Sequence, residues 1–544
     1  MVIIMIKKIE VCCDYLLIPV MAEEKTERIA IYDGEEKLYE FAVPVGRNEG
    51  IYAFHYYAPV PMSAWRGKCV TIEGDVPENF MEAVSLSDNV LQRTDKRPFI
   101  HFAANTGWLN DPNGLIWHDG IYHLFFQHNP FDIIWENMSW GHAVSSDLLH
   151  WTQKDDVLFP DGDGTMYSGC GMVNEREELG LGKDAEIFFY TCAGDNSEWS
   201  RNKKFVQKIA YSIDHGNTLV KKEGCVLGHI ADGNRDPKVY WHEKSEVYYM
   251  VLYLEKNEYA IFNSRDLEHW EMTQKMTFPL AWECPDLREV PVEGGGTRWM
   301  FWSADGYYFL GDFDGSCFET DGVCHEAYQS MLPYAAQTFW GCGRVIIIPW
   351  MRTCSRGKVY TGMMGIPRQL TLVEKDGDYI LRQKLVDEFE NSKEKVFSGS
   401  FGRDSDEIIY EQKCAAAVEV KLTLETNADF MVNIYGTVCT YDAGKALLKI
   451  DGIAERGNDV NKAARIKDKE NLSCEEPDSR WIRTGEQLRS ISFLSDGEIL
   501  EVTAEDGLVC GAYETKEDRK SGKIRIETDG KGEVEIFQIT ENES

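Results

Sequence analysis

The hydrophobic positions of this chain fall into short runs of β-branched and aromatic residues that are bounded by Gly, Asp, Asn and Pro. Runs of this length and composition are typical of β-strands. Clear examples lie at 120–126, 185–190, 246–253 and 344–348. Long amphipathic periods of the kind that helices need are scarce. The pattern therefore predicts an all-β protein.

One short pattern recurs along the central part of the chain. Residues 146–151 read Ser-Asp-Leu-Leu-His-Trp and residues 265–270 read Arg-Asp-Leu-Glu-His-Trp, while residues 212–219 between them have a similar layout. In each copy an Asp follows the end of a strand, where its carboxylate can accept hydrogen bonds from the N–H groups of the turn. The copies are roughly 50–70 residues apart, close to the span of a four-stranded propeller blade. The repeat favours a β-propeller.

The start of the chain differs from this central region. Residues 1–97 contain strand patterns at 15–20 and 68–73 but no cluster of functional polar groups, which indicates a small N-terminal β domain. A catalytic region is expected at 98–385. The stretch that follows the last long hydrophobic run is charged, partly helical and linker-like from residue 372 onwards, and we place the linker itself at 386–396.

The end of the chain alternates apolar and polar residues at 415–424, 488–493 and 533–539. A period of two indicates half-buried strands, so we expect a C-terminal β-sandwich at 397–544. The highly charged stretch 454–479 is predicted to be a long loop within it.

The charge of the chain excludes two classes of partner. The formal net charge is −34, from 57 Lys and Arg against 91 Asp and Glu. A surface this acidic repels phosphate backbones and anionic lipids, so neither nucleic acid nor a membrane surface is an expected partner. No run of 18 or more apolar residues is present, and the briefly apolar start has its charges after the apolar stretch, unlike a secretory signal. The oligomeric state stays open.

Cysteine and aromatic content add two expectations. The 15 Cys are odd in number and scattered through apolar segments, so we expect reduced thiols and a cytoplasmic location. No CxxC pair is present, and Cys342 and Cys354 have no spaced His or Cys partners, so no metal site is predicted. The 15 Trp admit two interpretations: large β-sheet cores, or flat rings that line a sugar site.

Three acidic residues stand out once other catalytic motifs are excluded. The chain has no G-x-S-x-G for a serine nucleophile, no H-E-x-x-H for zinc and no G-x-x-x-x-G-K-[ST] for nucleotide phosphates. What remains is Asp111, Asp236 and Glu283, each flanked by Pro or Trp near the predicted end of a strand.

Asp111 lies in the sequence Trp-Leu-Asn-Asp-Pro-Asn-Gly at 108–114. Because Pro fixes its own φ and disfavours the helical conformation in the residue before it, Asp111 is expected to be extended. The Pro-Asn-Gly that follows predicts a tight turn, which would hold the carboxylate at a strand end with little freedom. The alternative is a plain Asp-Pro turn without catalytic function.

Asp236 lies in Gly-Asn-Arg-Asp-Pro-Lys-Val at 233–239 and repeats the Asp-Pro pair. A neighbouring guanidinium lowers the pKa of a carboxyl group, so Arg235 is expected to keep Asp236 ionised. The alternative is an Arg–Asp turn on the surface.

Glu283 lies in Ala-Trp-Glu-Cys-Pro-Asp-Leu at 281–287, among apolar neighbours. Burial raises the pKa of a carboxyl group, as a general acid near neutral pH requires, and Asp286 would add charge repulsion in the same direction. The alternative is a solvated Glu at a strand edge. A carboxylate nucleophile, an ionised Asp and a protonated Glu together suit acetal cleavage through an oxocarbenium-like transition state.

These motifs resemble the signature motifs of glycoside hydrolase family 32, the invertases, inulinases and levanases. The matching segments are 108–114, 235–237 and 283–285, in the same order and at similar separations, with further matches at 126–130, 140–145, 167–169, 336–339 and 366–370. The likeness covers roughly residues 99–385 and fits the C-terminal region less specifically. It implies a five-bladed β-propeller followed by a β-sandwich, and a retaining double displacement.

The resemblance also implies roles for individual residues. Asp111 is the expected nucleophile, Glu283 the acid/base, and Asp236 a carboxylate that stabilises the transition state through the fructosyl hydroxyls. The positions similar to those that hold the terminal fructose are Asn110, Gln127, Trp135, Ser168 and Arg235, together with Tyr167, where the family more often has Phe, and Trp350 as an aromatic wall. The resemblance implies no metal and no organic cofactor.

The expected function is the release of fructose from β-D-fructofuranosides such as sucrose, fructo-oligosaccharides, inulin or levan. The N-terminal domain is similar to one seen on some bacterial members with fructan activity, which favours an exo-acting enzyme. One alternative is transfer of fructose to a sugar acceptor. Another is hydrolysis of sucrose 6-phosphate, because Arg352 and Arg356 stand where the family often has Asn. A sugar-binding protein without catalysis would need one of the three acids replaced, and all three are present.

Overall fold

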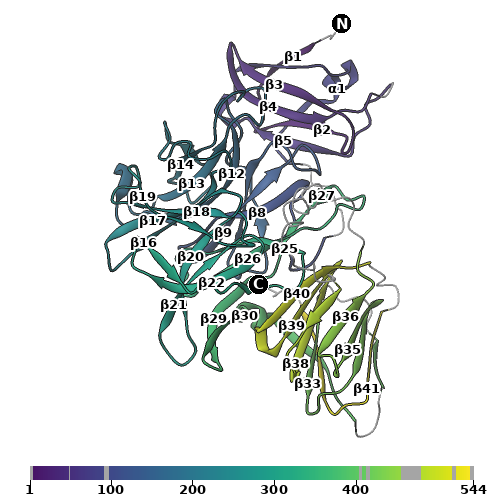
Figure 1. Cartoon of the computed structure of the whole chain (residues 1–544). Coiled ribbons are helices and arrows are strands. Elements are labelled where there is room, and N and C mark those ends of the chain that lie inside the picture. The colour runs from purple at the N-terminus through teal and green to yellow at the C-terminus, as the bar shows by residue number, and fades with distance from the viewer. Residues whose placement is uncertain are drawn as a thin grey trace.

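The computed structural model describes residues 4–47, 50–90, 97–402, 407–411, 417–454, 480–516 and 522–539. Their regular structure consists of strands apart from a few short helices, so the all-β prediction is confirmed. The sheets succeed one another along the chain, as the change of colour from purple to yellow in Figure 1 shows. Among the described residues, no helix combines the length and the hydropathy needed to cross a membrane.

The first part of the chain forms two small antiparallel sheets, with strand orders β1-β6-β3-β4 and β5-β2-β7. They share a hydrophobic core in which Leu16, Ile31 and Phe41 are almost fully buried. The elements are β1 (Met5–Glu10), β2 (Tyr15–Val20), β3 (Thr26–Asp33), β4 (Glu36–Pro44), β5 (Tyr56–Pro61), η1 (Ser63–Trp65), β6 (Cys69–Gly74), α1 (Glu78–Ala83) and β7 (Ser85–Ser87). The two strands predicted here are both observed.

Within the described stretch 97–402, five further sheets follow one another, each built on four antiparallel strands in chain order. The first three contain β8 (Gly107–His118), β9 (Ile121–Asn129), β10 (Ser139–Ser145) and β11 (Thr152–Gln153); β12 (Thr165–Val173), β13 (Glu186–Ala193), β14 (Val206–Ser212) and β15 (Val220–Lys221), with η2 (Glu178–Gly180); and β16 (Arg235–His242), β17 (Val247–Glu255), β18 (Glu258–Ser264) and β19 (Glu271–Thr277).

The fourth and fifth sheets have the same plan with short additions. They contain β20 (Asp286–Pro291), β21 (Thr297–Trp302), β22 (Tyr307–Phe313), β23 (Phe318–Thr320) and β24 (His325–Glu326); and β25 (Pro333–Thr338), β26 (Ile346–Met351), β28 (Met363–Met364), β29 (Arg368–Lys375) and β30 (Asp378–Leu385). The short β27 (Tyr360–Thr361) pairs in parallel with the start of β8.

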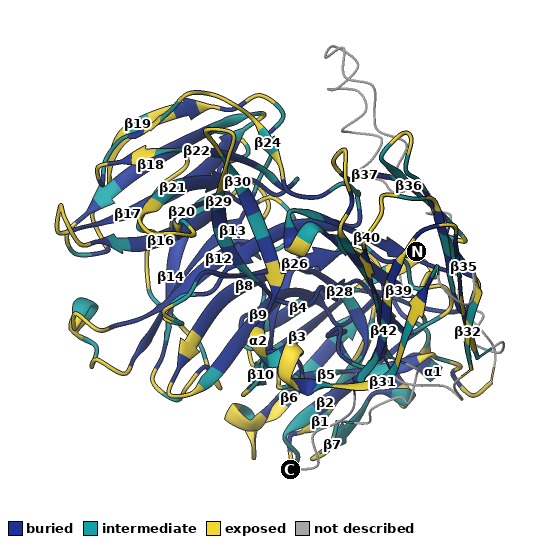
Figure 2. Cartoon of the chain, turned by 90° about the horizontal axis from the view of Figure 1, so that it is seen from below, coloured by how far each residue is buried: buried dark blue, intermediate teal, exposed yellow. Residues whose placement is uncertain are grey.

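Inner strands of the second and third of these sheets are covered on both faces. All eight residues of β13 are buried, and so are all but the last of β17. Figure 2 shows the same distribution, with dark blue strands and yellow confined largely to the loops. Because neither face meets water, these strands carry continuous hydrophobic runs instead of alternating ones. Those runs are what made the strands visible in the sequence.

The recurring Asp turns occupy equivalent places, each between the third and fourth strands of its sheet. Asp147 accepts hydrogen bonds from the N–H groups of Leu149 and His150, at 3.0 and 2.9 Å. Asp214 accepts one from the N–H group of Thr218 at 3.0 Å. The predicted self-bonded turn is confirmed.

The last part of the chain forms two sheets that pack face to face, with orders β31-β42-β33-β38-β39-β40 and β32-β41-β34-β35-β36-β37. They share a core that includes Val420, Ile450 and Phe493, so the predicted sandwich is present. The elements are α2 (Asp387–Ser392), β31 (Lys393–Phe401), β32 (Glu407–Glu411), β33 (Ala417–Leu424), β34 (Phe430–Ile434), β35 (Thr437–Asp442), β36 (Leu447–Asp451), β37 (Trp481–Arg483), β38 (Ser490–Asp496), β39 (Ile499–Ala504), η3 (Glu505–Gly507), β40 (Val509–Glu514), β41 (Lys523–Thr528) and β42 (Gly532–Ile539).

The charged stretch from residue 372 onwards is more ordered than the sequence indicated. Its first part lies in β29 and β30, where the charges belong to partly exposed positions of a two-stranded hairpin. The segment 386–396 holds the helix α2 and the first residues of β31, which agrees with the partly helical character predicted for it. Of the predicted loop at 454–479, only Ala454 lies inside the described residues.

A buried charged network joins the central sheets to the sandwich. His101 Nδ1 lies 2.9 Å from Asp496 Oδ2, and His101 Nε2 lies 3.1 Å from Glu501 Oε1. Arg368 on β29 pairs with the other oxygen of Glu501 at 2.5 Å. Burial opposes the charge on His101, but the two carboxylates outweigh it and raise the pKa of His101 to about 9. The imidazole is therefore charged at neutral pH and fixes the sandwich against the sheet that carries β29.

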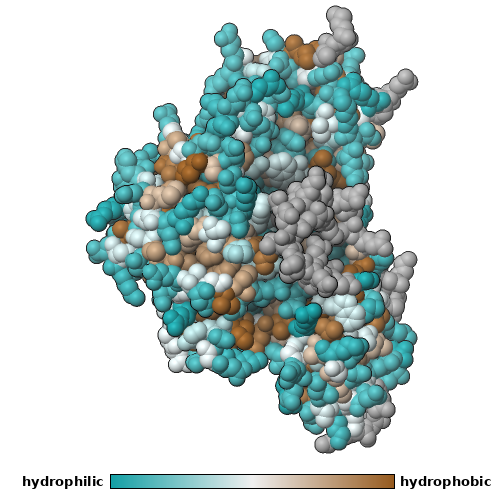
Figure 3. Space-filling model, viewed as in Figure 1, coloured by the Kyte–Doolittle hydropathy of each residue, from teal (hydrophilic) through white to brown (hydrophobic). Residues whose placement is uncertain are grey.

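The face seen in Figure 3 is mainly hydrophilic, with hydrophobic side chains in scattered patches. This agrees with the acidic charge of the chain. No cysteine among the described residues takes part in a disulfide.

Candidate active site

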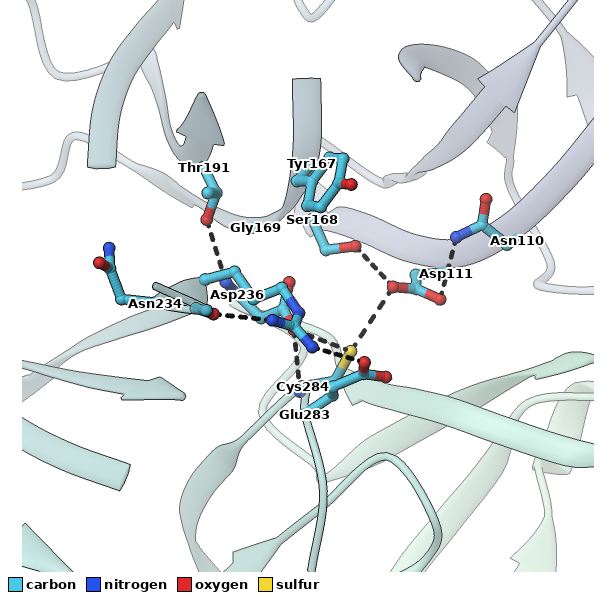
Figure 4. A network of polar contacts seen from close by, with 12 residues as sticks. Asn110, Asp111, Tyr167, Ser168, Gly169, Thr191, Asn234, Asp236, Glu283 and Cys284 are labelled. Atoms are coloured by element: carbon cyan, nitrogen blue, oxygen red, sulfur yellow. Dashed lines mark hydrogen bonds and ion pairs between the residues drawn. The ribbon is translucent and has the colours of Figure 1, made fainter. Parts of the chain in front are cut away.

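The residues predicted for the site line one cavity of about 690 Å³. They are Asn110, Asp111, Gln127, Trp135, Tyr167, Ser168, Arg235, Asp236, Glu283 and Trp350. They come from all five central sheets or the loops that join them, so the fold gathers positions that are far apart in the sequence. Figure 4 shows the polar contacts at the centre of this cavity.

Asp111 is placed by an irregular stretch of β8 and not by a turn. The strand continues to His118, and its register with β9 shifts between Leu109 and Pro112 and again between Asn113 and Ile116. A β-bulge of this kind re-aims a side chain without ending the strand. The predicted tight turn after Asp111 is therefore wrong: the Pro-Asn-Gly residues make a second irregularity inside the same strand.

Asp111 is held by three hydrogen bonds. Ser168 Oγ donates to Oδ2 at 2.6 Å, Asn110 Nδ2 donates to Oδ1 at 3.2 Å, and the Cys284 thiol lies 3.5 Å from Oδ2. All three side chains point toward the carboxylate in Figure 4. Burial raises the pKa of Asp111, the hydrogen bond from Ser168 lowers it in part, and the charge of Glu283 raises it further. The carboxylate is thus fixed in position and aimed into the cavity.

Asp236 lies at the start of β16 in a left-handed backbone conformation, with φ of 63°. Its backbone N–H donates to Thr191 Oγ1 at 3.0 Å, and its Oδ2 accepts from the N–H of Cys284 at 3.1 Å. Glu283 and Cys284 also have positive φ, of 51° and 38°. Non-glycine residues in this region are strained, and such residues concentrate at functional sites.

The prediction that Arg235 keeps Asp236 ionised is wrong. Burial is the largest effect on the pKa of Asp236, and the charges of Asp111 and Glu283 act in the same direction. These three effects outweigh the charge of Arg235 and raise the pKa of Asp236 to about 7. The shortest contact of Arg235 with a carboxylate is to Glu283, at 2.6 Å, whereas its Nε lies 3.7 Å from Asp236 Oδ2.

Glu283 does not lie among apolar neighbours as the sequence indicated. Its side chain is 24% exposed, Arg235 donates to Oε1, and the hydroxyl of Tyr334 donates to Oε2 at 2.6 Å. Asp286 does not add repulsion next to it, because Asp286 pairs with Lys238 at 3.2 Å and accepts two hydrogen bonds from Thr338. Glu283 is therefore a polar group at the wall of the cavity.

Cys284 connects the three acids. Its thiol lies 3.5 Å from Asp111 Oδ2 and 3.5 Å from Asp236 Oδ2, and it directly follows Glu283. Burial and these carboxylates raise the pKa of the Cys284 thiol. It stays protonated and acts as a weak hydrogen-bond donor between the two aspartates.

The polar residues around the acids are themselves fixed by the fold. Trp108 Nε1 donates to Asn110 Oδ1 at 2.8 Å, which turns the amide nitrogen of Asn110 toward Asp111. Gln127 Nε2 donates to the carbonyl of Met166 at 2.8 Å, which fixes this side chain at the wall of the cavity.

Aromatic rings form two walls. On one side the ring of Tyr167 lies 6.0 Å from that of Trp135 and 5.4 Å from that of Phe205, and its hydroxyl accepts from Asn196 at 3.0 Å. On the other side Trp350 packs edge-on against Trp108 and Tyr334, at 5.7 and 6.1 Å. Flat faces of this kind suit the apolar faces of sugar rings.

The N-terminal sheets hold the segment that carries Trp135. The ring of Phe131 stacks on Phe41 with centroids 3.9 Å apart. The side chain of Asn137 accepts from the N–H of Ala42 and donates to its carbonyl, both at 2.8 Å. The N-terminal domain therefore supports one wall of the cavity, a role that the sequence did not indicate.

Comparison with known proteins identifies the family. A model of the glycosyl hydrolases family 32 N-terminal domain matches residues 101–385. The chain belongs to glycoside hydrolase family 32. The resemblance inferred from the motifs is thus confirmed.

Two curated relatives of this family 32 chain are similar to it over less than half of its length. The levanase of Bacillus subtilis (strain 168) is 35% identical over 257 residues, which cover 43% of this chain and 37% of the levanase. The extracellular exo-inulinase of Aspergillus awamori is 33% identical over 262 residues, 41% of this chain and 49% of the relative. The chain therefore spans less than half the length of these two relatives.

The solved structures agree on the fold. The crystal structure of exo-inulinase from Aspergillus awamori superposes with a TM-score of 0.69 at 23% identity, and covers 82% of this chain and 99% of that one. The share of the chain that it covers is larger than the stretch that the family model matches.

Several cavity residues of this family 32 chain were not predicted. Trp108 lies inside one of the recognised motifs and Trp282 directly precedes another, so both could have been identified from the sequence. No sequence motif indicated Tyr334 or Phe205, because only the fold brings them to the cavity. The remaining unpredicted lining residues are Asp232, Gly233, Lys256, Asn257, Leu280, Ala281 and Asp305.

The basic residues that suggested a phosphorylated substrate do not reach the cavity. Arg356 pairs with Glu514 of β40 at 2.9 Å, and Arg352 donates to the carbonyl of Met331 and stacks on Tyr334. Neither lines the cavity. Their charges are used within the fold, so they give no support to hydrolysis of sucrose 6-phosphate.

Ser168→Ala should move the acid limb of the pH profile to higher pH. The hydrogen bond from Ser168 lowers the pKa of Asp111, so its loss raises that pKa and less of Asp111 is ionised at a given acid pH. We also expect kcat/KM at the optimum to fall by about tenfold to a hundredfold, as for loss of a hydrogen bond to a charged group. The pH dependence of kcat/KM measures both.

Ser145→Ala is the matched control for this prediction. Ser145 is a buried serine on β10 that donates to Asp147 in a turn outside the cavity. Its variant should leave the profile unchanged. An unshifted acid limb in Ser168→Ala would show that Asp111 does not set that limb.

Proposed function

We propose that this chain is a retaining β-fructosidase that releases fructose from β-D-fructofuranosides. The observation that carries the proposal is the meeting of Asp111 on β8, Asp236 on β16 and Glu283 in the loop before β20, around Cys284 in one cavity. The relatives named a levanase and an exo-inulinase support fructans as the substrate class.

In the proposed reaction Asp111 attacks the anomeric carbon of the fructosyl unit. Glu283 donates a proton to the leaving oxygen as the glycosidic bond breaks, which leaves a fructosyl ester on Asp111. Water then attacks the same carbon and gives its proton to Glu283, and the ester bond to Asp111 breaks. Two inversions give net retention. Asp236 accepts hydrogen bonds from fructosyl hydroxyls that strengthen in the transition state.

The groups around Asp111 prepare it for attack. Ser168 and Asn110 hold its two oxygens in place, so little orientation remains to be lost when the substrate binds. Arg235 and Tyr334 do the same for the two oxygens of Glu283.

The fold proposal is more detailed than the family match. We assign the five central sheets to the blades of a five-bladed β-propeller at 98–385, followed by the sandwich at 397–544, with a separate N-terminal domain at 1–97. Four strands in each sheet and the Asp turn at the same place in three of them support this assignment.

Exo action is supported by the size of the site. The cavity of about 690 Å³ lies in the range of pockets that enclose a small ligand. Two aromatic walls and the three acids at its centre suit the terminal fructose of a chain.

Product analysis tests the proposal. We expect fructose as the first product from sucrose, inulin and levan when the purified chain is incubated with each and sampled over time by chromatography. The fructose first formed should have the β configuration by NMR, as a retaining mechanism requires. No fructose from any of the three would contradict the function. Oligosaccharides before fructose would contradict exo action alone, and products longer than the substrate at high sucrose would indicate transfer.

A further inference from the structure

A second cluster of reactive side chains lies outside the cavity, at the far end of β8. His118 at the end of β8, Glu186 at the start of β13 and His215 in the turn after β14 place one nitrogen or oxygen each within 4.8 Å of one another. None of them lines the catalytic cavity. His118 follows Asp111 by seven positions along the strand, which is about 20 Å at the rise of a β-strand.

The carboxylate at the centre of this cluster is fully buried. Glu186 is 0% exposed, and its Oε1 lies 2.9 Å from His118 Nδ1 and 3.9 Å from His123 Nε2. Its Oε2 is buried with no hydrogen-bond partner among the described residues. A buried carboxylate with a free oxygen is costly unless a cation or donor meets it.

Imidazoles surround this carboxylate. His142 Nε2 and His123 Nδ1 share a hydrogen bond of 3.1 Å. The ring of His118 lies 5.1 Å from that of His215. Four of the 12 His of the chain are therefore within one small region. Imidazole nitrogen with a single carboxylate is the donor set of zinc and similar divalent ions, whereas magnesium and calcium prefer oxygen throughout.

The Asp turns give an internal comparison. In two copies the His lies three positions after the Asp and pairs with it, as His150 does with Asp147 at 2.7 Å and His269 with Asp266 at 2.8 Å. In the third copy Asp214 is bonded to Ser212 and Thr218, and His215 lies at the next position with φ of 56° and faces His118. This turn is thus built to present an exposed imidazole to the buried carboxylate.

We propose that His118, Glu186 and His215 form a binding site for one divalent transition-metal ion of the zinc class, with water as a fourth ligand. The ion would neutralise Glu186 and join the first two central sheets, which supply β8 and β13. Ligands of one tetrahedral zinc ion lie about 3.4 Å apart, so a small approach of the three side chains completes the site. His215, in an exposed turn, is free to make most of that movement. This site was not expected from the sequence, which has no local zinc motif.

Metal analysis of matched variants tests the proposal. The wild-type chain, His215→Ala, Glu186→Gln and the control His269→Ala are each equilibrated with ZnCl₂, separated from free ion and analysed for zinc. Exposed thiols bind zinc equally in all four, so the difference between variants reports the site. We expect wild type and His269→Ala to retain one equivalent more than His215→Ala and Glu186→Gln, with at least about tenfold weaker binding in those two.

Thermal unfolding gives a second readout. Zinc should raise the unfolding midpoint of wild type and His269→Ala but not that of His215→Ala, because a ligand that binds only the folded chain stabilises it. Equal zinc content and an equal shift in His215→Ala would overturn the proposal, whether or not Glu186→Gln folds. The same shift from MgCl₂ at equal concentration would overturn the metal class. Neither result depends on fructoside hydrolysis, so this test is separate from that of the proposed function.

Discussion

Asp111→Ala is expected to lower kcat on sucrose by at least about four orders of magnitude. The variant loses a carboxylate that three donors hold and aim at the substrate position. Without it no fructosyl ester forms, and Asp236 does not replace it because its oxygen is engaged by the N–H of Cys284. Initial rates with purified variant and wild type measure the loss.

The stability of Asp111→Asn separates lost chemistry from lost folding. Burial raises the pKa of Asp111 in the folded chain above its unfolded value. The folded state then binds protons more readily, so the charge of Asp111 lowers the free energy of unfolding above that pKa. Asn keeps the shape and removes the charge. Its unfolding midpoint at neutral pH should equal or exceed that of wild type, and the gain should shrink as pH falls through the folded pKa.

Asp312→Asn provides the control for these variants. Asp312 is a carboxylate on β22 whose side chain is 83% exposed and does not line the cavity. The same substitution there should change kcat by less than about twofold, as surface changes usually do. A fully active Asp111→Ala enzyme would contradict the mechanism. An Asp111→Asn variant with a clearly lower unfolding midpoint than wild type would contradict the stability prediction.

The strands were predictable because their burial requires a recognisable hydrophobic pattern in the local sequence. β13 and β17 are buried on both faces, so their sequences are continuous hydrophobic runs. The Asp turns were also predictable, since the Asp carboxylate accepts hydrogen bonds from backbone N–H groups only a few residues away. The support of Trp135 by the N-terminal sheets had no such local pattern, because Phe41 and Phe131 meet only through the fold.

The three acids were found from sequence, but their surroundings were not. Arg235 is next to Asp236 in the chain, yet it makes its short ion pair with Glu283. The pKa of Asp236 rises to about 7 because the side chain is buried and distant carboxylates, Asp111 and Glu283, are folded against it. Adjacency along the chain is a poor guide to a pKa that is set mainly by burial and by charges from distant parts of the chain.

The bulges in β8 show that the local sequence is also a poor guide to the backbone conformation around Asp111. Asp-Pro-Asn-Gly is a sequence that suits a turn, and local propensity alone predicts one. In the protein the stretch is paired with β9 on both sides of the irregularity, so the sheet carries the strand onward. Pairing within the sheet overrides the turn propensity, and the bulge still gives the carboxylate of Asp111 a fixed direction.

Glu283→Ala should separate substrates by their leaving groups. On sucrose or inulin the leaving sugar oxygen needs a proton, so we expect kcat to fall by about two to four orders of magnitude. On an aryl β-fructoside with a nitrophenol leaving group the proton matters little in the first step, and the loss in kcat/KM should stay below about tenfold.

Glu289→Ala is the matched control, since Glu289 lies on β20 six positions further on and is exposed outside the cavity. It should behave as wild type on both substrates. If Glu283→Ala lost activity equally on sucrose and on the aryl fructoside, Glu283 would act by binding the fructosyl unit and not by donating a proton. Its contacts fix its position: Arg235 and Tyr334 hold both oxygens at the wall of the cavity, where the side chain is 24% exposed.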